Sequence, residues 1–198
     1  VVEEQLAFEI KSEGEIDYHD NHSYPDQGLM KVLRESTDAM DMYLHHLPDR
    51  LSYRVEYKIA TSDDMEDLMS SRLEMLKVVN NLRFTYKFSD EIVESIIEYF
   101  KNGDHTTVLA MDGNRVIGCA TICYIYIMPT FSHPTGKRAH LMNVHTMKEW
   151  QRHGIAKKMV SMLIDEAWKR GVTEISLDAT EEGRPLYKKL GFVDSTEG

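Results

Sequence analysis

The sequence predicts an α/β fold in which helices flank a β-sheet, and three observations indicate it. Residues 53–60 alternate between apolar and polar side chains, as a half-buried strand does. Residues 106–111 and 115–128 are two further strand-like runs, and the Asp-Gly-Asn sequence between them is typical of a hairpin turn. Residues 141–167 combine an apolar strand, a short polar turn and an amphipathic helix. Strands and helices therefore alternate within one chain.

The first 51 residues are expected to form an N-terminal extension ahead of the main domain, residues 52–198. Residues 1–10 have the pattern of a strand, and the polar residues that follow read as a loop. Residues 27–47 carry apolar side chains at helical spacing before Pro48. The apolar face of this expected helix either packs on the core or makes an oligomer contact, for example in a homodimer.

Two helices are expected after the first core strand. Thr61 and Asp64 have the spacing of a capping box, and the helix that begins there carries apolar residues on one side through Val79. A second helix is expected over residues 89–101, with Gly103 at its end. The remaining expected elements are a strand at 139–146, a helix at 154–170 closed by Gly171, a strand at 172–180, a short helix at 183–190 and a strand from Phe192.

Composition limits the class of protein. No apolar run approaches the roughly 18 residues of a membrane helix, and no signal-peptide pattern is present, so we expect a soluble, cytoplasmic protein without membrane contact. The formal net charge of −10 argues against nucleic-acid binding and suits a cationic partner. Cys119 and Cys123 would lie about 13 Å apart along one strand face, too far for a disulfide, so we expect reduced thiols. They form no metal-ligand pattern with the histidines.

The turn at residues 151–156, Gln-Arg-His-Gly-Ile-Ala, is a candidate phosphate-binding site. A helix N-terminus has N–H groups without intrahelical acceptors and about half a positive charge, which suits a phosphate ligand. Gly154 and Ala156 leave the main chain open to close approach, while Arg152 and Lys157 add positive charge. The pattern predicts a pyrophosphate-binding turn. The alternative is that the small residues serve close packing of the helix on the sheet.

The order of these motifs resembles the GNAT superfamily of acyl-CoA-dependent N-acyltransferases. The matching motifs are Gln/Arg-x-x-Gly-x-Gly/Ala at residues 151–156 and Leu-Tyr-Lys-Lys-Leu-Gly-Phe at residues 186–192. The resemblance covers roughly residues 53–193 and implies a mixed, mainly antiparallel, twisted sheet. Two central parallel strands, residues 141–146 and 175–179, would splay apart. The family usually has a further final strand, which we expect to be missing here, either because the chain was cut or because another segment fills the edge.

The resemblance also assigns a coenzyme site. The pantetheine arm would contact the main chain of Val144 and Thr146, and the diphosphate would contact the amides of residues 152–157. Thr180 stands where the family commonly has Asn, but its hydroxyl can still donate a hydrogen bond. The expected cofactor-binding residues are Val144, Thr146, Gln151, Arg152, His153, Gly154, Ile155, Ala156, Lys157 and Thr180.

Tyr187 matches the tyrosine that the family often uses as general acid toward the coenzyme thiolate, and the alternative is a tyrosine that only packs in the core. Asn143 and His145 share one strand face by alternation, which we expect to point at the acceptor site. With an ordinary pKa near 6.5, His145 is a candidate general base. Water, or one of three nearby acidic side chains, is the alternative base: Asp178, Glu181 or Glu182.

The expected function is transfer of an acetyl group from acetyl-CoA, the cosubstrate, to the primary amine of a small, cationic acceptor, without a metal. The competing hypothesis is a CoA-binding sensor or regulatory module that keeps the phosphate-binding turn but has no catalysis. Tyr187 and a competent acceptor pocket are the features that separate the two hypotheses.

Overall fold

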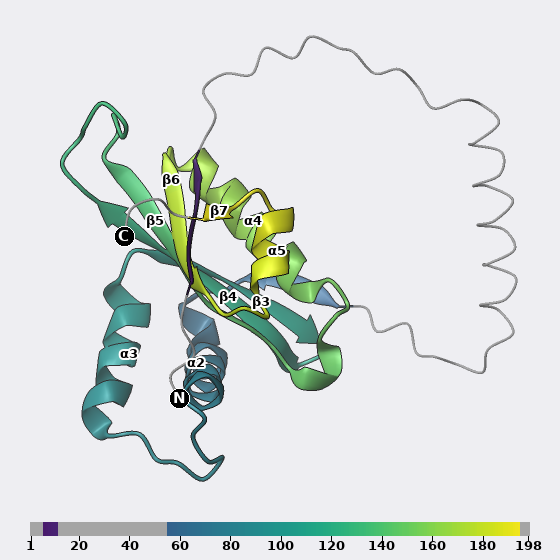
Figure 1. Cartoon of the computed structure of the whole chain (residues 1–198). Helices are drawn as coiled ribbons and strands as arrows, with labels where there is room; N and C mark the ends of the chain where they lie inside the picture. Colours follow the sequence, from purple (N-terminus) through teal and green to yellow (C-terminus); the bar gives the residue numbers. More distant parts are fainter. Residues whose placement is uncertain (1–5, 12–54, 195–198) are drawn as a thin grey trace, which may run out of the picture. The chain divides into compact units, whose positions relative to one another are not determined.

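A computed structural model gives the structure of the protein and describes residues 6–11 and 55–194. Within these residues, seven strands form one sheet in the order β2-β3-β4-β5-β6-β1-β7 (Figure 1). Strands β5 and β6 are parallel, and every other neighbouring pair is antiparallel. The mixed, mainly antiparallel sheet that the sequence predicts is therefore confirmed.

The helices and strands lie close to their predicted positions. The capping box forms as expected, with Thr61 N donating to Asp64 Oδ2 at 2.9 Å. The described residues contain no helix long and apolar enough to span a bilayer. In chain order, the elements are β1 (Leu6–Lys11), β2 (Glu56–Ile59), the short 3₁₀ helix η1 (Ser62–Asp64), α2 (Met65–Val79), α3 (Asp90–Asn102), β3 (His105–Asp112), β4 (Arg115–Tyr126), β5 (Lys137–Thr146), the 3₁₀ helix η2 (Lys148–Trp150), α4 (Ile155–Lys169), β6 (Glu174–Ala179), α5 (Arg184–Lys189) and β7 (Val193–Asp194).

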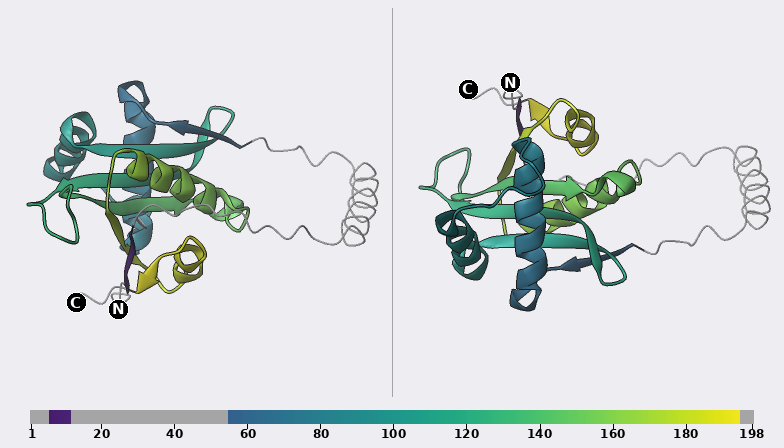
Figure 2. Two further views of the ribbon diagram at one scale, coloured as in Figure 1. Left: turned by 90° about the horizontal axis from the view of Figure 1, so that it is seen from above. Right: turned by 90° about the horizontal axis from the view of Figure 1, so that it is seen from below.

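Helices cover both faces of the sheet. Helix α4 packs on one face, and α2 lies across the other, as the two views of Figure 2 show. Alternation along β3 explains why both faces are apolar: Val108 belongs to the core under α4, whereas Leu109 packs with Leu68 of α2. The central strands are therefore buried on both sides and form a rigid support for residues at their ends.

Strand β1 lies between β6 and β7, so a segment from the start of the chain fills a place in the sheet, which is one of the two alternatives given above for the missing final strand. It pairs with β6 from Leu6 opposite Ala179 to Lys11 opposite Glu174, and it also pairs with β7. Strand β1 is held in this position by its apolar side, because Phe8 is completely buried in the core under α4. Residues 6–11 thus belong to the sheet, although the sequence placed them in the extension.

The expected loop and the helix at 27–47 lie outside the described residues, as does the boundary at residue 51. They stay predictions, together with the homodimer contact.

An ion-pair cluster reinforces the position of β1. Glu174, the first residue of β6, is 2% exposed, and Lys11 Nζ of β1 lies 3.6 Å from its carboxylate. Arg138 of β5 contacts the same carboxylate, and His133 Nε2 lies 3.7 Å away. A buried carboxylate requires such partners. The cluster therefore joins β5, β6 and β1 at the end of the sheet where β6 begins.

Strands β5 and β6 pair over only part of their length. Their register runs from Arg138 opposite Glu174 to Leu141 opposite Leu177 and ends there. On the other side of β5, Asn143 and the next residue together oppose one residue of β4, which is a β-bulge. Asn143 has φ 56°, in the left-handed region that Asn tolerates better than most residues. The bulge coincides with the point where β5 leaves β6, so the splayed parallel strands expected from the sequence are confirmed.

Candidate active site

A cleft of about 660 Å³ opens where β5 and β6 separate. It is lined by the end of β5, the first turn of α4, the residues after β6, part of α5 and one side of α2. The structure thus brings together segments that are far apart in the sequence. The expected site residues that line the cleft are Asn143, Val144, His145, Thr146, Gln151, Arg152, Gly154, Ile155, Ala156, Lys157, Thr180 and Tyr187.

The N-terminus of α4 presents free main-chain donors to this cleft. Gly154 is the N-cap, with φ 79°, a conformation that glycine adopts without strain. The first helical hydrogen bond runs from Lys158 N to Gly154 O at 3.0 Å, so the preceding amides of the first turn have no acceptor in the described part of the chain. No acidic side chain lies in this turn, and a Cβ added at Gly154 would meet no atom within 4 Å. The site can therefore accept an anion at close range.

The turn before α4 is held against the end of β5. Gln151 Nε2 donates to the carbonyl of Thr146 at 3.2 Å, so this side chain supports the turn. Arg152 has φ 65°, an uncommon conformation for a residue with a side chain. His153 is exposed and does not line the cleft, unlike the other expected residues of the turn. Of His153, only the main-chain amide therefore remains as an expected contact of the coenzyme diphosphate.

Tyr187 of α5 is buried and lines the cleft. Its ring packs between those of Phe8 and Phe192, with centroid distances of 6.4 and 5.8 Å. Burial raises the pKa of Tyr187 to about 12, so the phenol keeps its proton throughout the neutral pH range. The residue can donate a hydrogen bond there but cannot act as a base. Phe8 comes from the other end of the chain, and no local sequence pattern indicates that it supports this ring.

Asn143 and His145 lie on the face of β5 that α2 covers. Asn143 Oδ1 accepts a hydrogen bond from Arg72 Nη1 at 3.4 Å, and Asn143 Nδ2 donates to Thr121 Oγ1 at the same distance. Val144, by contrast, packs against the core under α4. The side-chain amide of Asn143 is therefore fixed by protein partners, and its neighbour Arg72 is a cleft residue that the sequence analysis did not select.

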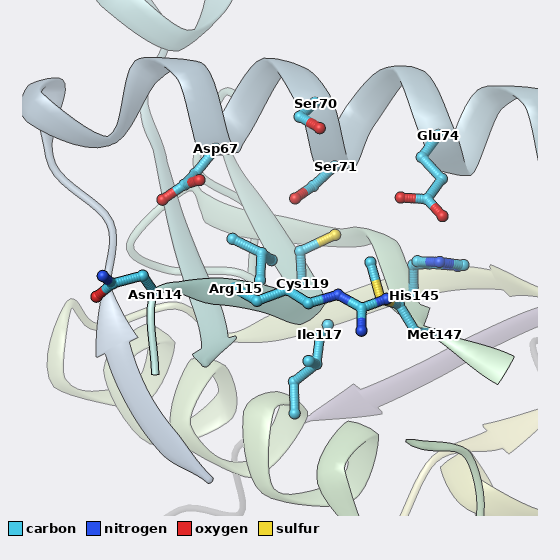
Figure 3. A pocket seen from close by; sticks show the side chains of 12 residues that line it. Asp67, Ser70, Ser71, Glu74, Asn114, Arg115, Ile117, Cys119, His145 and Met147 are labelled. Carbon is cyan, nitrogen blue, oxygen red and sulfur yellow. The ribbon is translucent and has the colours of Figure 1, made fainter. Parts of the chain in front are cut away.

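His145 lies between the main cleft and a second cavity of about 260 Å³ beneath α2. Figure 3 shows this second cavity, with Glu74 of α2 near the ring of His145. Burial lowers the pKa of His145 below its ordinary value of 6.5, and the carboxylate of Glu74 opposes this in part. Nε2 is buried and has no hydrogen-bond partner among the described residues. At pH 7 the imidazole is therefore neutral and able to accept a proton.

The residues after β6 supply further polar groups. Asp178 and Glu182 line the cleft, and Glu181 does not. Asp178 Oδ2 lies 3.9 Å from His140 Nε2. Thr180 Oγ1 accepts a hydrogen bond from Gly183 N at 3.3 Å, which leaves its hydroxyl proton free to be donated.

Among the described residues, no three His, Cys, Asp or Glu side chains are grouped to hold a metal ion.

The fold and the cleft together define a class of protein in which two splayed parallel strands frame a cleft that ends at the open N-terminus of a helix. The model of the acetyltransferase (GNAT) family matches residues 73–192, which is more than half of the chain. The chain therefore belongs to the GNAT acetyltransferase family.

One curated relative is a glucosamine 6-phosphate N-acetyltransferase of Trypanosoma brucei brucei, 27% identical over 78 residues. These residues are 39% of this chain and 51% of the relative, so the chain spans about half the length of the curated relative that it matches. Among solved structures, a predicted acetyltransferase with acetyl-CoA from Clostridium acetobutylicum is 29% identical, with TM-score 0.64 over 73% of this chain and 93% of that one. A GCN5-related N-acetyltransferase of Ralstonia eutropha has TM-score 0.62 at 23% identity, covering 73% and 95% of the two chains, and shares the fold.

Proposed function

We propose that the protein transfers an acetyl group from acetyl-CoA to the primary amine of a small acceptor. The observation that carries this proposal is the cleft between the splayed strands β5 and β6, which ends at the open N-terminus of α4. Membership of the GNAT acetyltransferase family supports acetyl transfer. The solved relative with acetyl-CoA supports this donor, and the relative named for glucosamine 6-phosphate supports an amine as acceptor.

The coenzyme would lie along the cleft from α4 to the β-bulge. Its diphosphate would accept hydrogen bonds from the free amides of the first turn of α4, with Arg152 and Lys157 adding positive charge. Its pantetheine arm would bond to the main chain of Val144 and Thr146, because β5 has no pairing with β6 beyond Leu141. The thioester supplies the activated acetyl group.

The chemistry needs a neutral amine and a proton donor for the departing sulfur. The amine nitrogen attacks the thioester carbonyl carbon, the carbon–sulfur bond breaks, and the nitrogen loses a proton. His145, neutral at pH 7, is the proposed acceptor of that proton, and Asn143 would fix the adjacent main chain. The Tyr187 hydroxyl, still protonated, is the proposed general acid, which donates its proton to the departing sulfur.

The proposed partner is a small molecule and not a nucleic acid or a membrane. A formal net charge of −10 disfavours polyanions and favours the protonated, cationic form of an amine in the encounter. We also propose that the protein is located in the cytoplasm.

A thiol-release assay with acetyl-CoA, run beside a calorimetric titration with CoA, tests this function. The amine panel should include glucosamine 6-phosphate, amino acids, a polyamine and an aminoglycoside. We expect micromolar to millimolar CoA binding and amine-dependent thiol release, with the acetylated amine identified by its mass. Tight CoA binding without turnover on any amine would contradict catalysis and favour the sensor hypothesis.

His145→Gln is expected to flatten the acidic limb of the kcat/KM profile. Because burial lowers the pKa of His145, the parental limb should bend below pH 6.5: the neutral base is present above this pH, and activity falls as the imidazole is protonated. The profile must be measured with two amines of different basicity, because only a limb that stays in place belongs to the protein. An acidic limb that survives in the variant would assign the base to Asp178, Glu182 or water.

Gly154→Val is expected to weaken CoA binding at least about tenfold, or about 1.4 kcal/mol. Valine disfavours the φ of 79°, and its side chain would occupy space that the diphosphate needs. Gly113→Val is the matched control, because Gly113 also has a positive φ, 57°, and open space, but lies in the β3–β4 turn outside the cleft. Titration with CoA measures the loss of CoA affinity, and a melting curve measures how far backbone strain at the substituted position lowers stability. Equal CoA affinity in both folded variants would contradict the phosphate site.

A further inference from the structure

Arg72 is a charged side chain on an apolar stretch of α2. Residues three and four positions apart are neighbours on a helix surface, and all four such neighbours of Arg72 are apolar: Leu68, Met69, Met75 and Leu76. Glu74 is only two positions away and lies beside His145 in the second cavity. The helix therefore places no carboxylate where it could pair with Arg72.

The rest of the structure supplies no counter-charge either. Within the described residues Arg72 makes no ion pair, and its hydrogen bond to Asn143 Oδ1 is long, at 3.4 Å. The titratable groups that interact with it are the thiols of Cys119 and Cys123, and burial raises the pKa of both, so they are neutral at pH 7. Burial also lowers the pKa of Arg72 itself. A partly buried cation with five N–H donors and one weak bond is an unfavourable arrangement by itself.

The guanidinium lies at the place where an acceptor would react. Arg72 lines the main cleft, and its bond to Asn143 places it at the β-bulge where β5 leaves β6. In the proposed function the thioester lies against the main chain of this part of β5. The attacking amine must then come within about 3–3.5 Å of the thioester carbon, so the remainder of a small acceptor is within reach of Arg72.

We propose that Arg72 binds a carboxylate or phosphate group of the acceptor, which therefore carries an anion as well as its amine. Both anions match the planar donor geometry of a guanidinium, which can bind them with two parallel hydrogen bonds. The inference rests on the proposed function and narrows its class of acceptor substrates. The acceptor would carry the cationic amine that the sequence predicts, and it would also carry an anionic group that binds Arg72.

The test compares the binding of matched amines to the protein saturated with CoA, which has no acetyl group to transfer. Alanine with alaninamide tests a carboxylate; phosphoethanolamine with ethanolamine, and glucosamine 6-phosphate with glucosamine, test a phosphate. We expect the anionic member of at least one pair to bind about tenfold tighter or more in the parent protein, and this ratio to fall close to one in Arg72→Met. Arg72→Lys should keep part of the preference. Arg83→Met removes an exposed arginine outside the cleft and should keep the parental ratio.

Thermal stability is a second readout. Methionine suits the apolar stretch of α2, so Arg72→Met should melt at the parental temperature or above it. Equal affinities within every pair in the parent, or an unchanged preference in Arg72→Met, would overturn the inference. A preference for the anionic amine that is lost in Arg72→Met, without thiol release on any amine, would contradict the proposed function and still support Arg72 as the anion-binding residue. Thiol release without that preference would support the function and overturn the inference.

Discussion

Replacing Tyr187 with Phe is expected to lower kcat by about 10²-fold or more while CoA affinity changes little. The ring packs between Phe8 and Phe192, and this packing is kept in the variant, whereas the hydroxyl that would stabilise the departing sulfur is lost. A factor of 10² corresponds to about 2.7 kcal/mol of transition-state stabilisation. Initial rates at saturating acetyl-CoA, together with a CoA titration, separate the chemical step from binding.

The pH dependence sharpens this test. Because the pKa of Tyr187 is raised to about 12, the hydroxyl is protonated over the whole neutral range, so the ratio of parental to variant kcat should not change between about pH 6 and 9. Tyr57→Phe is a suitable control, since burial also raises the pKa of Tyr57 but this residue of β2 does not line the cleft. Parental kcat in Tyr187→Phe would remove the tyrosine from the mechanism.

Phe8→Ala is expected to lower the free energy of unfolding by about 3–5 kcal/mol, a large part of the stability of a typical domain. Phe8 is fully buried in the core, and the cations of Arg184 and Lys188 lie 5.9 and 5.4 Å from its ring centroid. The cavity would also remove one side of the packing around Tyr187, so kcat should fall more than CoA affinity. Urea unfolding monitored by circular dichroism gives the stability change.

Two further variants complete the measurement. Phe131→Ala is the control, because Phe131 is fully exposed in the β4–β5 connection and its loss should change stability by less than about 0.5 kcal/mol. Phe8→Leu keeps an apolar side chain and provides a folded protein for kinetics if the alanine variant unfolds. A Phe8→Ala protein as stable as Phe131→Ala would show that β1 does not occupy the sheet between β6 and β7.

Local patterns in the sequence were sufficient to predict most helices and strands, whereas the sheet topology and the cleft were expected from the resemblance to the GNAT superfamily. The capping box at Thr61, the β3–β4 hairpin and the start of α4 at Gly154 each depend on a few adjacent residues, and all three are confirmed. The position of β1 could not be predicted in the same way. Alternation indicates that residues near Phe8 form a strand, but its partners, Ala179 and Asp194, are determined by long-range pairing.

Two features of the site also depend on tertiary contacts. Strand alternation placed Asn143 and His145 on one face, but the bulge at Asn143 arises from its pairing with β4. The sequence alone does not single out Arg72, because the apolar side of its helix has the pattern of a core-facing surface. The signal that could have identified it is an arginine whose neighbours at three and four positions are all apolar, since a partly buried charge of this kind needs a partner from elsewhere.

The most direct test of the whole account is a crystal structure of the protein with CoA. We expect the diphosphate at the amides of the first turn of α4, the pantetheine arm hydrogen-bonded to the main chain of Val144, and the sulfur beside Tyr187 and the β-bulge at Asn143. Coenzyme bound outside the cleft between β5 and β6, for example in the second cavity beside Glu74, would contradict the account.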